Sequence, residues 1–226
     1  FNAVHGAPGE NGQIISFLEL INLPYTGSNS YSSALTFNKR DCLSILKNHG
    51  INSSNNYYLD ENEKINEDEI IKSVGLPCFV KANRSGSSFG IYKVYKKNEL
   101  TLAIQKAFKE DSQLIIERAL NGREFSVGAY RLNNEVKVLP ITEIISENDF
   151  FDYSAKYEGK SEEITPAKLD DENINKLKSI SIKIFKLLNL NGFTRSEFII
   201  ENNIPYLLDI NTVPGLTNES ILPKQL

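Results

Sequence analysis

Asp209-Ile210-Asn211-Thr212-Val213-Pro214-Gly215, close to the end of this 226-residue chain, predicts the end of a functional strand. The preceding Leu207-Leu208 supplies the apolar content of a strand, and side chains two residues apart on a strand share a face. Asp209 and Asn211 would then project together, and Mg²⁺ prefers oxygen ligands of this kind. The segment therefore predicts half of a magnesium site.

A second predicted strand, Arg195-Ser196-Glu197-Phe198-Ile199-Ile200, places a cation and a carboxylate on one face by the same period. The connection at 201–205 is short enough for a hairpin. Pairing the two strands would bring Arg195, Glu197, Asp209 and Asn211 into one patch. An acid and an amide near a strand end often only cap a turn, but two acids, an amide and an arginine beside Pro-Gly favour a site.

Bulk composition excludes several classes of protein. A net charge of −4 and a pI near 5.4 argue against a nucleic-acid binder, and no apolar run is long enough to span a membrane. Cys42 and Cys78 provide neither a disulfide framework nor metal-ligand spacing. We expect a cytoplasmic protein. The absence of Met and the strand-like start at 1–4 predict an internal fragment that stops without a closing element.

The periodicity of apolar residues predicts helices and strands in blocks. Helices are expected over 13–22, from Ser33 to about 48, and over 66–75, 98–110 and 171–189. Strands are expected over 1–4, 23–27, 77–82, 91–95, 114–118, 124–131 and 135–144, with a polar, aromatic loop over 146–161. Because strands and helices do not alternate strictly, an α+β fold is favoured over a doubly wound parallel sheet.

The segment from Lys81 to Gly90 joins two of these strands and is rich in Gly and Ser. It lacks the order of a Walker loop. Its small residues could still fold over phosphates as a nest of backbone N–H groups, with Lys81 as a point charge. A plain hairpin loop is the alternative.

Five further side chains allow two interpretations each. Glu117 and Glu124, at neighbouring strand ends, could bind a nucleotide's polar edge or ribose, but spacing alone favours solvated acids. Lys156 and Tyr157 lie in a loop that could be a lid over a phosphorylated centre, or an aromatic loop packed on the sheet. His5, in a glycine-rich turn before a helix, could serve an anionic group or be a turn residue.

Taken together and in order, the motifs resemble those of D-alanine–D-alanine ligases, members of the ATP-grasp superfamily, over essentially the whole chain. The segments that carry the resemblance are His5-Gly6 with Gly9-Glu10-Asn11-Gly12, Leu23-Pro24-Tyr25-Thr26-Gly27, Lys81 with Gly86-Ser87-Ser88-Phe89-Gly90, Tyr153 to Tyr157, Arg195-Ser196-Glu197, and Asp209 to Thr217 with Ser220. The resemblance implies two α+β subdomains that clasp ATP. It assigns 1–27 to the remnant of an N-terminal α/β domain, 28–114 to a central subdomain and 115–226 to a C-terminal subdomain.

The resemblance also implies roles for individual residues. ATP would be contacted at its phosphates by Lys39, Lys81 and Lys156, and at adenine and ribose by Glu117, Leu120 and Glu124. Two Mg²⁺ ions, with Mn²⁺ as a substitute, would be held by Glu197, Asp209 and Asn211. Ser87 would bridge to Tyr157 in the lid. Arg195 and the backbone of Gly215 would stabilise an oxyanion, Ser220 would hold the second substrate's carboxylate, and His5 would lie near the first D-alanine.

The implied activity is ATP-dependent joining of two D-alanine molecules through an acyl phosphate, for peptidoglycan precursors, by a homodimer in the full-length form. One alternative is another ATP-grasp ligase, such as one that joins D-alanine to D-lactate. The other is a Mg-ATP-binding module without turnover. Asp209 is shorter than the acid expected at its position, so the sequence leaves metal affinity open.

Overall fold

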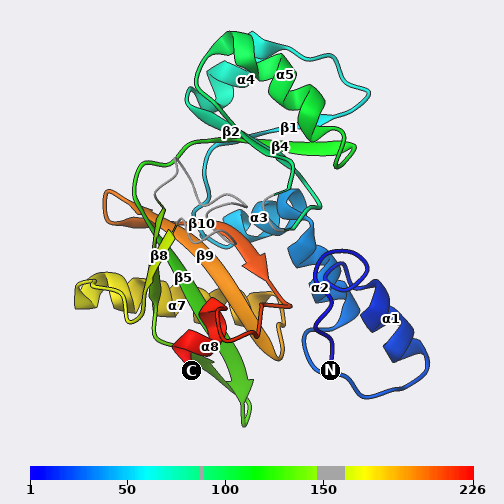
Figure 1. Ribbon diagram of the computed structural model, residues 1–226, viewed down its shortest axis with the longest axis vertical. Coiled ribbons are helices and arrows are strands. Elements are labelled where there is room, and N and C mark those ends of the chain that lie inside the picture. Colours follow the sequence, from blue (N-terminus) through cyan, green and yellow to red (C-terminus); the bar gives the residue numbers. More distant parts are fainter. Residues whose placement is uncertain (87–88, 147–160) are drawn as a thin grey trace.

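The computed structural model describes residues 1–86, 89–146 and 161–226, which form two separate antiparallel sheets with helices packed on them. Figure 1 shows the smaller sheet at the top and the larger sheet below, with the N-terminal helices beside the larger one. Each sheet has its own hydrophobic core. The predicted α+β class is confirmed.

The small sheet has the strand order β1-β4-β2-β3. Its strands are β1 (Asn56–Asp60), β2 (Cys78–Ala82), β3 (Ile91–Val94) and β4 (Gln113–Arg118), and α4 (Glu67–Val74) and α5 (Lys97–Ala107) pack on it. Helix α4 begins where the Asn66 side chain accepts the Glu69 N–H, and it ends at Gly75 with φ of 74°. Val80, Ile104 and Leu114 are fully buried between the layers.

The large sheet runs β10-β9-β5-β7-β8, with β6 paired to β5. Its strands are β5 (Arg123–Leu132), β6 (Glu135–Val138), β7 (Thr142–Ser146), β8 (Ser161–Ile164), β9 (Phe193–Glu201) and β10 (Ile204–Asn211). Helix α7 (Asp171–Leu187) packs against it and buries Phe185 with Phe125 and Phe198 of the sheet. The other face of the sheet is therefore available for a site.

Asparagine pairs make the two tightest hairpins of this sheet. Asn202 and Asn203 have φ of 52° and 63°, and Asn133 and Asn134 have φ of 49° and 65°. Two consecutive residues with positive φ are the signature of a type I′ turn, whose twist matches that of the flanking strands. The predicted 195–211 hairpin is confirmed.

Several predicted boundaries were wrong. The single helix expected from Ser33 is two helices, α2 (Ser30–Phe37) and α3 (Lys39–Asn48), because Asn38 ends the first and its side chain caps the second. Residues 135–144 form two strands, since Pro140 cannot donate a ladder hydrogen bond. The stretches 1–4 and 23–27 are not strands, and the first described helix is α1 (Gln13–Leu20).

The C-terminal residues form a short helix on the large sheet. Helix α8 (Ile221–Gln225) lies on β5, where Gln225 Nε2 donates to the Ser126 carbonyl (3.0 Å) and to Thr142 Oγ1 (2.9 Å). These hydrogen bonds fix the end of the chain beside the centre of the large sheet. In the part of the chain that the structure describes, no helix is long and apolar enough to cross a membrane.

Candidate active site

The two predicted ligand strands meet through a bulge. In the β9–β10 ladder Leu207 pairs with Phe198, but Asp209 pairs with Glu197 and Asn211 with Arg195, so Leu208 is an extra residue. Directly opposed residues share a face, and in an unbroken ladder Asp209 would follow Leu207 into the core. The bulge turns both Asp209 and Asn211 to the open face.

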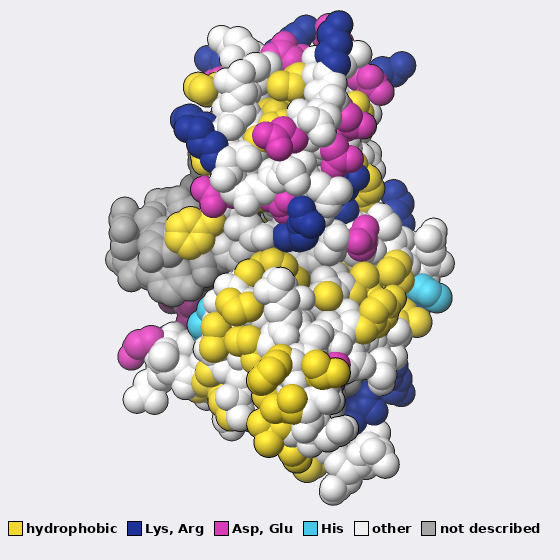
Figure 2. All heavy atoms as spheres, turned by 90° about the vertical axis from the view of Figure 1, so that its right-hand side faces the viewer, with side chains coloured by type: hydrophobic (Ala, Val, Ile, Leu, Met, Phe, Trp, Pro, Cys, Tyr) yellow, Lys and Arg dark blue, Asp and Glu magenta, His cyan; other side chains and the backbone are white. Residues whose placement is uncertain are grey.

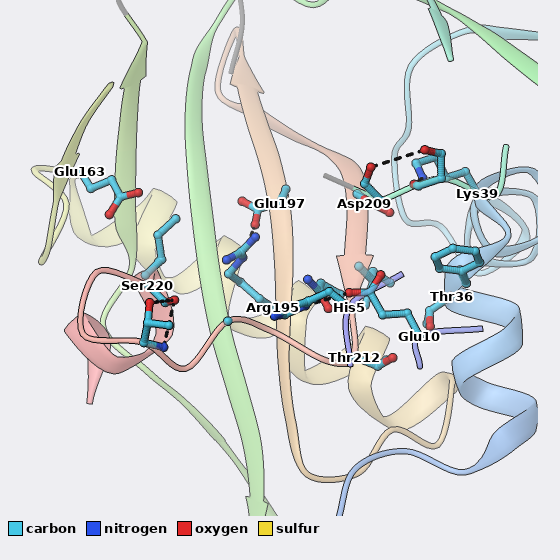
Figure 3. A pocket seen from close by; sticks show the side chains of 18 of the residues that line it. His5, Glu10, Thr36, Lys39, Glu163, Arg195, Glu197, Asp209, Thr212 and Ser220 are labelled. Carbon is cyan, nitrogen blue, oxygen red and sulfur yellow. Dashed lines mark hydrogen bonds and ion pairs between the residues drawn. The ribbon is translucent and has the colours of Figure 1, made fainter. Parts of the chain in front are cut away.

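A cavity of about 400 Å³ opens on this face. Figure 3 shows side chains from the sheet, the N-terminal turn, α2 and α3, and the C-terminal segment pointing into it. Its lining includes eight predicted site residues, namely His5, Lys39, Arg195, Glu197, Asp209, Asn211, Gly215 and Ser220. The predicted convergence of Arg195, Glu197, Asp209 and Asn211 is present in the fold.

Glu197 is held by one of its two oxygens. Oε1 accepts hydrogen bonds from Arg195 Nε (2.6 Å) and from Ser126 Oγ (3.3 Å), whereas Oε2 is buried and has no hydrogen-bond partner within the described ranges. Burial lowers the pKa of Arg195, but the charge and hydrogen bond of Glu197 together with the charges of Glu163 and Asp209 outweigh it, so the pKa is raised and the guanidinium stays charged. An unpaired buried carboxylate oxygen is costly unless something else binds it.

The donor set fits a divalent cation. Glu197 Oε2 has a free lone pair, Asp209 projects from the facing strand, and Asn211 Oδ1 is oriented by the Val213 N–H at 2.8 Å. Among the described residues no cluster of three His, Cys, Asp or Glu side chains could hold a metal. The candidate set has two acids and an amide instead, and such oxygen ligands suit Mg²⁺, which also keeps several waters.

A tight turn after β10 places Gly215 against Ser220. Ser220 Oγ accepts the Thr217 N–H (3.2 Å) and lies 2.9 Å from Thr217 Oγ1. A Cβ on Gly215 would lie 2.6 Å from Ser220 Oγ, so a larger residue would displace the serine. The turn therefore presents a backbone and a hydroxyl group side by side at the cavity wall.

The N-terminal turn contributes an acid that the sequence interpretation did not select. Glu10 lines the cavity, and its Oε1 lies 3.2 Å from His5 Nδ1. Burial raises the pKa of Glu10, His5 opposes the rise and the charge of Asp209 adds to it. Glu163 of β8 was also missed; it lines the cavity and pairs with Lys224 at 3.2 Å. No local sequence signal marks Glu163, because its role depends on β8 joining the far edge of the sheet.

The predicted nucleotide residues divide between the sheets. Lys39 lines the cavity and its Nζ donates to the Ser85 carbonyl at 2.7 Å. Lys81 pairs with Glu117 at 2.6 Å across β2 and β4, outside the cavity lining. Leu120 lies in the link from β4 to β5, and Glu124 is on β5 opposite Ile144 and Ile199. The other predicted residues, Ser87, Lys156 and Tyr157, lie outside the described residues.

Comparison with known proteins identifies the family. Residues 45–226 match the model of the D-Ala D-Ala ligase C-terminus. A D-alanine–D-alanine ligase from Flavobacterium johnsoniae is 56% identical over the whole of this chain, which covers 70% of that protein.

Two solved structures place the chain in the same group. The D-alanine–D-alanine ligase from Bacillus anthracis complexed with ATP has a TM-score of 0.85 and 31% identity, over 98% of this chain and 70% of that one. The D-Ala:D-Ser ligase VanG from Enterococcus faecalis also has a TM-score of 0.85 and 31% identity, over 99% and 66%. This chain belongs to the D-alanine–D-alanine ligase family and has its ATP-grasp fold.

Proposed function

We propose that this protein joins two D-alanine molecules to D-alanyl-D-alanine at the expense of ATP, as a step in peptidoglycan precursor synthesis. The reaction would begin with transfer of the γ-phosphate to the carboxylate of the first D-alanine. The acyl phosphate would then be attacked by the amine of the second D-alanine, and phosphate would leave. Family membership and the composition of the cavity support the proposal.

ATP would lie between the sheets with its phosphates toward the cavity. Lys39, on α3, and Lys81, on β2, approach this region from different elements of the central subdomain, and each would bind phosphate oxygens as a point charge. Glu117 would accept a hydrogen bond from adenine or ribose through Oε1, which is buried and unpartnered within the described residues. Leu120 and Glu124 would complete the adenine and ribose pocket, and Lys156 would face the γ-phosphate.

Glu197, Asp209 and Asn211 would hold two Mg²⁺ ions, or Mn²⁺. A bound divalent cation would supply neutralising charge for the phosphates and for the developing transition state. The protein orients the metal ligands in advance. Arg195 binds Glu197 Oε1 and leaves Oε2 available for the cation.

The acyl-transfer step would use Arg195 together with the C-terminal turn that lines the cavity. Arg195 and the Gly215 N–H would stabilise the tetrahedral oxyanion, while Ser220 would bind the carboxylate of the second D-alanine and His5 would lie beside the first. Ser87 and Tyr157 would bridge the phosphate loop to the lid, which would protect the acyl phosphate from water. The observation that carries the proposal is that Arg195, Glu197, Asp209, Gly215 and Ser220 line one cavity.

A coupled assay of phosphate release tests the proposal. The full protein, with ATP and Mg²⁺ at saturation, should release phosphate in proportion to added D-alanine and form the dipeptide. L-Alanine serves as the matched control and should give no release. Absence of D-alanine-dependent release would refute the ligase, and calorimetric binding of Mg-ATP without turnover would indicate a nucleotide-binding module instead.

The identity of the second substrate needs its own measurement. The likeness to a D-Ala:D-Ser ligase shows that the same fold accommodates a different acceptor. Competition between D-alanine, D-serine and D-lactate near neutral pH, followed by product analysis, distinguishes these ligases. We expect D-alanyl-D-alanine as the main product.

We also propose a cytoplasmic homodimer. Cys42 and Cys78 are both free and buried, as in proteins of reducing compartments.

The surface of the molecule supports the dimer. Figure 2 shows charged side chains over the small sheet and hydrophobic ones gathered lower, on the side where α1 and α2 lie. Phe17 and Leu20 of α1 are 60% and 81% exposed, which supports an association surface there. Light scattering tests the dimer.

The proposed division into subdomains needs one adjustment. The expected boundary between residues 114 and 115 falls inside β4, and α3 packs into the core of the large sheet. We therefore keep 1–27, 28–114 and 115–226 as the approximate division but place the second boundary after Arg118. Limited proteolysis should cut the 119–122 link before it cuts either sheet.

A further inference from the structure

Asn83 is a completely buried polar residue at the start of the phosphate loop. It follows β2 directly and has 0% of its surface exposed. A buried amide needs partners for its oxygen and for both N–H groups. Asn83 therefore marks a place where the fold has arranged several polar groups around one side chain.

The partners of Asn83 tie the small sheet to the start of α3. Its Oδ1 accepts the Arg40 N–H at 2.9 Å, and its Nδ2 donates to Asn38 Oδ1 at 2.9 Å and to Gln113 Oε1 at 3.3 Å. The Lys39 N–H donates to the Asn83 carbonyl at 3.4 Å. All the polar atoms of the side chain are thus used, and three of these four bonds reach consecutive residues of α3's first turn and cap.

This contact spans two cores. Cys42 and Leu43 of α3 belong to the core of the large sheet, whereas Val80 of β2 belongs to that of the small sheet. Lys39 and Lys81 stand on opposite sides of the contact, one at the start of α3 and the other two residues before Asn83. The Asn83 contact therefore fixes the backbone from which the Lys39 side chain extends relative to the end of β2, which carries Lys81.

We propose that Asn83 is a positioning residue for nucleotide binding: it locks the start of α3 to the end of β2 and so holds Lys39 and Lys81 at the spacing that a triphosphate needs. The inference rests on the proposed use of ATP. It assigns Asn83 no contact with ATP. Its effect on ATP comes through the placement of two charges contributed by separate elements, α3 and β2.

The test compares Asn83→Ala with Asn66→Ala. Asn66→Ala is the control because it also removes a helix-capping hydrogen bond. This bond lies at the start of α4, which packs on the small sheet away from the cavity. Calorimetry with ATP and Mg²⁺ should show that Asn83→Ala, which removes three hydrogen bonds of a buried side chain, weakens ATP binding by about tenfold. The KM for D-alanine should change less than about twofold, and Asn66→Ala should bind ATP like the wild type.

Two results would overturn the inference. One is a folded Asn83→Ala variant with unchanged ATP affinity; the other is an equal loss in Asn66→Ala, which would indicate general destabilisation. If circular dichroism shows that Asn83→Ala does not fold, Asn38→Ala carries the test, because it removes the acceptor of the Asn83 amide, and wild-type affinity in that variant refutes the role. Wild-type protein that binds ATP but releases no phosphate would refute the ligase proposal and leave this comparison intact.

Discussion

Glu117 in the small sheet and Glu197 in the large sheet are built alike and placed differently. Glu117 is buried and Glu197 partly buried; each has one carboxylate oxygen paired to a cation at 2.6 Å and leaves its other, buried oxygen without a hydrogen-bond partner among the described residues. Glu117 receives its cation from the neighbouring strand, where Lys81 lies outside the cavity lining. Glu197 receives it from its own strand, where Arg195 lines the cavity.

The difference separates the two tasks of the site. A half-paired buried carboxylate costs stability unless a ligand completes it, so both positions are expected to serve binding. Glu117 does not line the cavity and would serve only the nucleotide, whereas Glu197 lines it and lies where the phosphate and both substrates would react. We therefore expect loss of Glu117 to weaken ATP binding and loss of Glu197 to stop the chemistry.

The largest effect is expected from Glu197→Gln. The amide keeps the size and can still accept from Arg195, but it removes the charge that a divalent cation needs, so kcat should fall by roughly 100-fold. Phosphate release at saturating ATP and D-alanine measures it, and titration with Mn²⁺ should show weaker metal binding. A kcat within threefold of the wild type would remove Glu197 from the metal site.

Glu117→Gln should give a smaller effect of another kind. The substitution weakens the ion pair with Lys81, and it also weakens the buried oxygen as a hydrogen-bond acceptor for the nucleotide. The KM for ATP should therefore rise about tenfold with kcat nearly unchanged. The same assay at varied ATP measures this. If kcat fell as far as in Glu197→Gln while ATP was saturating, the division of tasks between the sheets would be wrong.

Asp111 provides a structural counterpart with both oxygens paired. Burial would raise its pKa, but hydrogen bonds from the Arg84 guanidinium and from the Arg84 and Gln113 N–H groups prevail, so the pKa is lowered. Its stabilisation is therefore complete above the unfolded pKa, near 3.8, and is lost as pH falls through the folded value. Asp111→Asn should lower the free energy of unfolding by about 1–3 kcal/mol at pH 7.

The pH dependence is the control for this variant. Urea unfolding at pH 7 and near pH 3 should show the gap between wild type and Asp111→Asn narrowing on acidification, because the wild type loses the charged form. A gap that stayed constant with pH would mean that the carboxylate charge contributes nothing.

The smallest effect concerns the hairpin that holds Asp209 opposite Glu197. Asn203 has φ of 63° at the second turn position, where glycine is favoured, so Asn203→Gly should stabilise the protein by about 0.5 kcal/mol. Asn203→Ala should destabilise it, since alanine disfavours positive φ. Thermal unfolding measures the stability of both variants. If both were stabilised or both destabilised, the turn assignment would be contradicted.

Sequence reasoning succeeded where the signal was local. The β9–β10 hairpin could be predicted because alternation and a short polar turn specify it, and helices such as α4 were marked by their caps. The break at Asn38 was missed, because one residue both ends α2 and caps α3. Lys39 was selected only through the family resemblance, since no local pattern shows that α3 will lie beside the phosphate loop.

The convergence of Asp209 and Asn211 on one face with Glu197 was predicted correctly, but for an incomplete reason. Alternation alone puts Leu207, Asp209 and Asn211 on one face, yet Leu207 is in the core and the other two line the cavity. The extra residue at Leu208 reverses the face, and nothing in its immediate sequence marks a bulge. The positions of Glu10 and Glu163 in the cavity lining also depend on long-range packing, which patterns in a single sequence do not show.

Gly128 does not line the cavity, but the C-terminal part of the cavity wall depends on its lack of a side chain. A Cβ there would lie 2.3 Å from Gln225 Oε1 and 2.9 Å from Leu222 Cδ1, so even alanine would force these two α8 side chains to move. The Gln225 side chain anchors α8 to Ser126 and Thr142, and Ser220 directly precedes that helix, so the change would loosen Ser220 as well. A search for loss-of-function variants that considered only residues near the substrates would therefore miss Gly128→Ala. This single methyl group, buried beneath the C-terminal helix, would alter substrate binding indirectly.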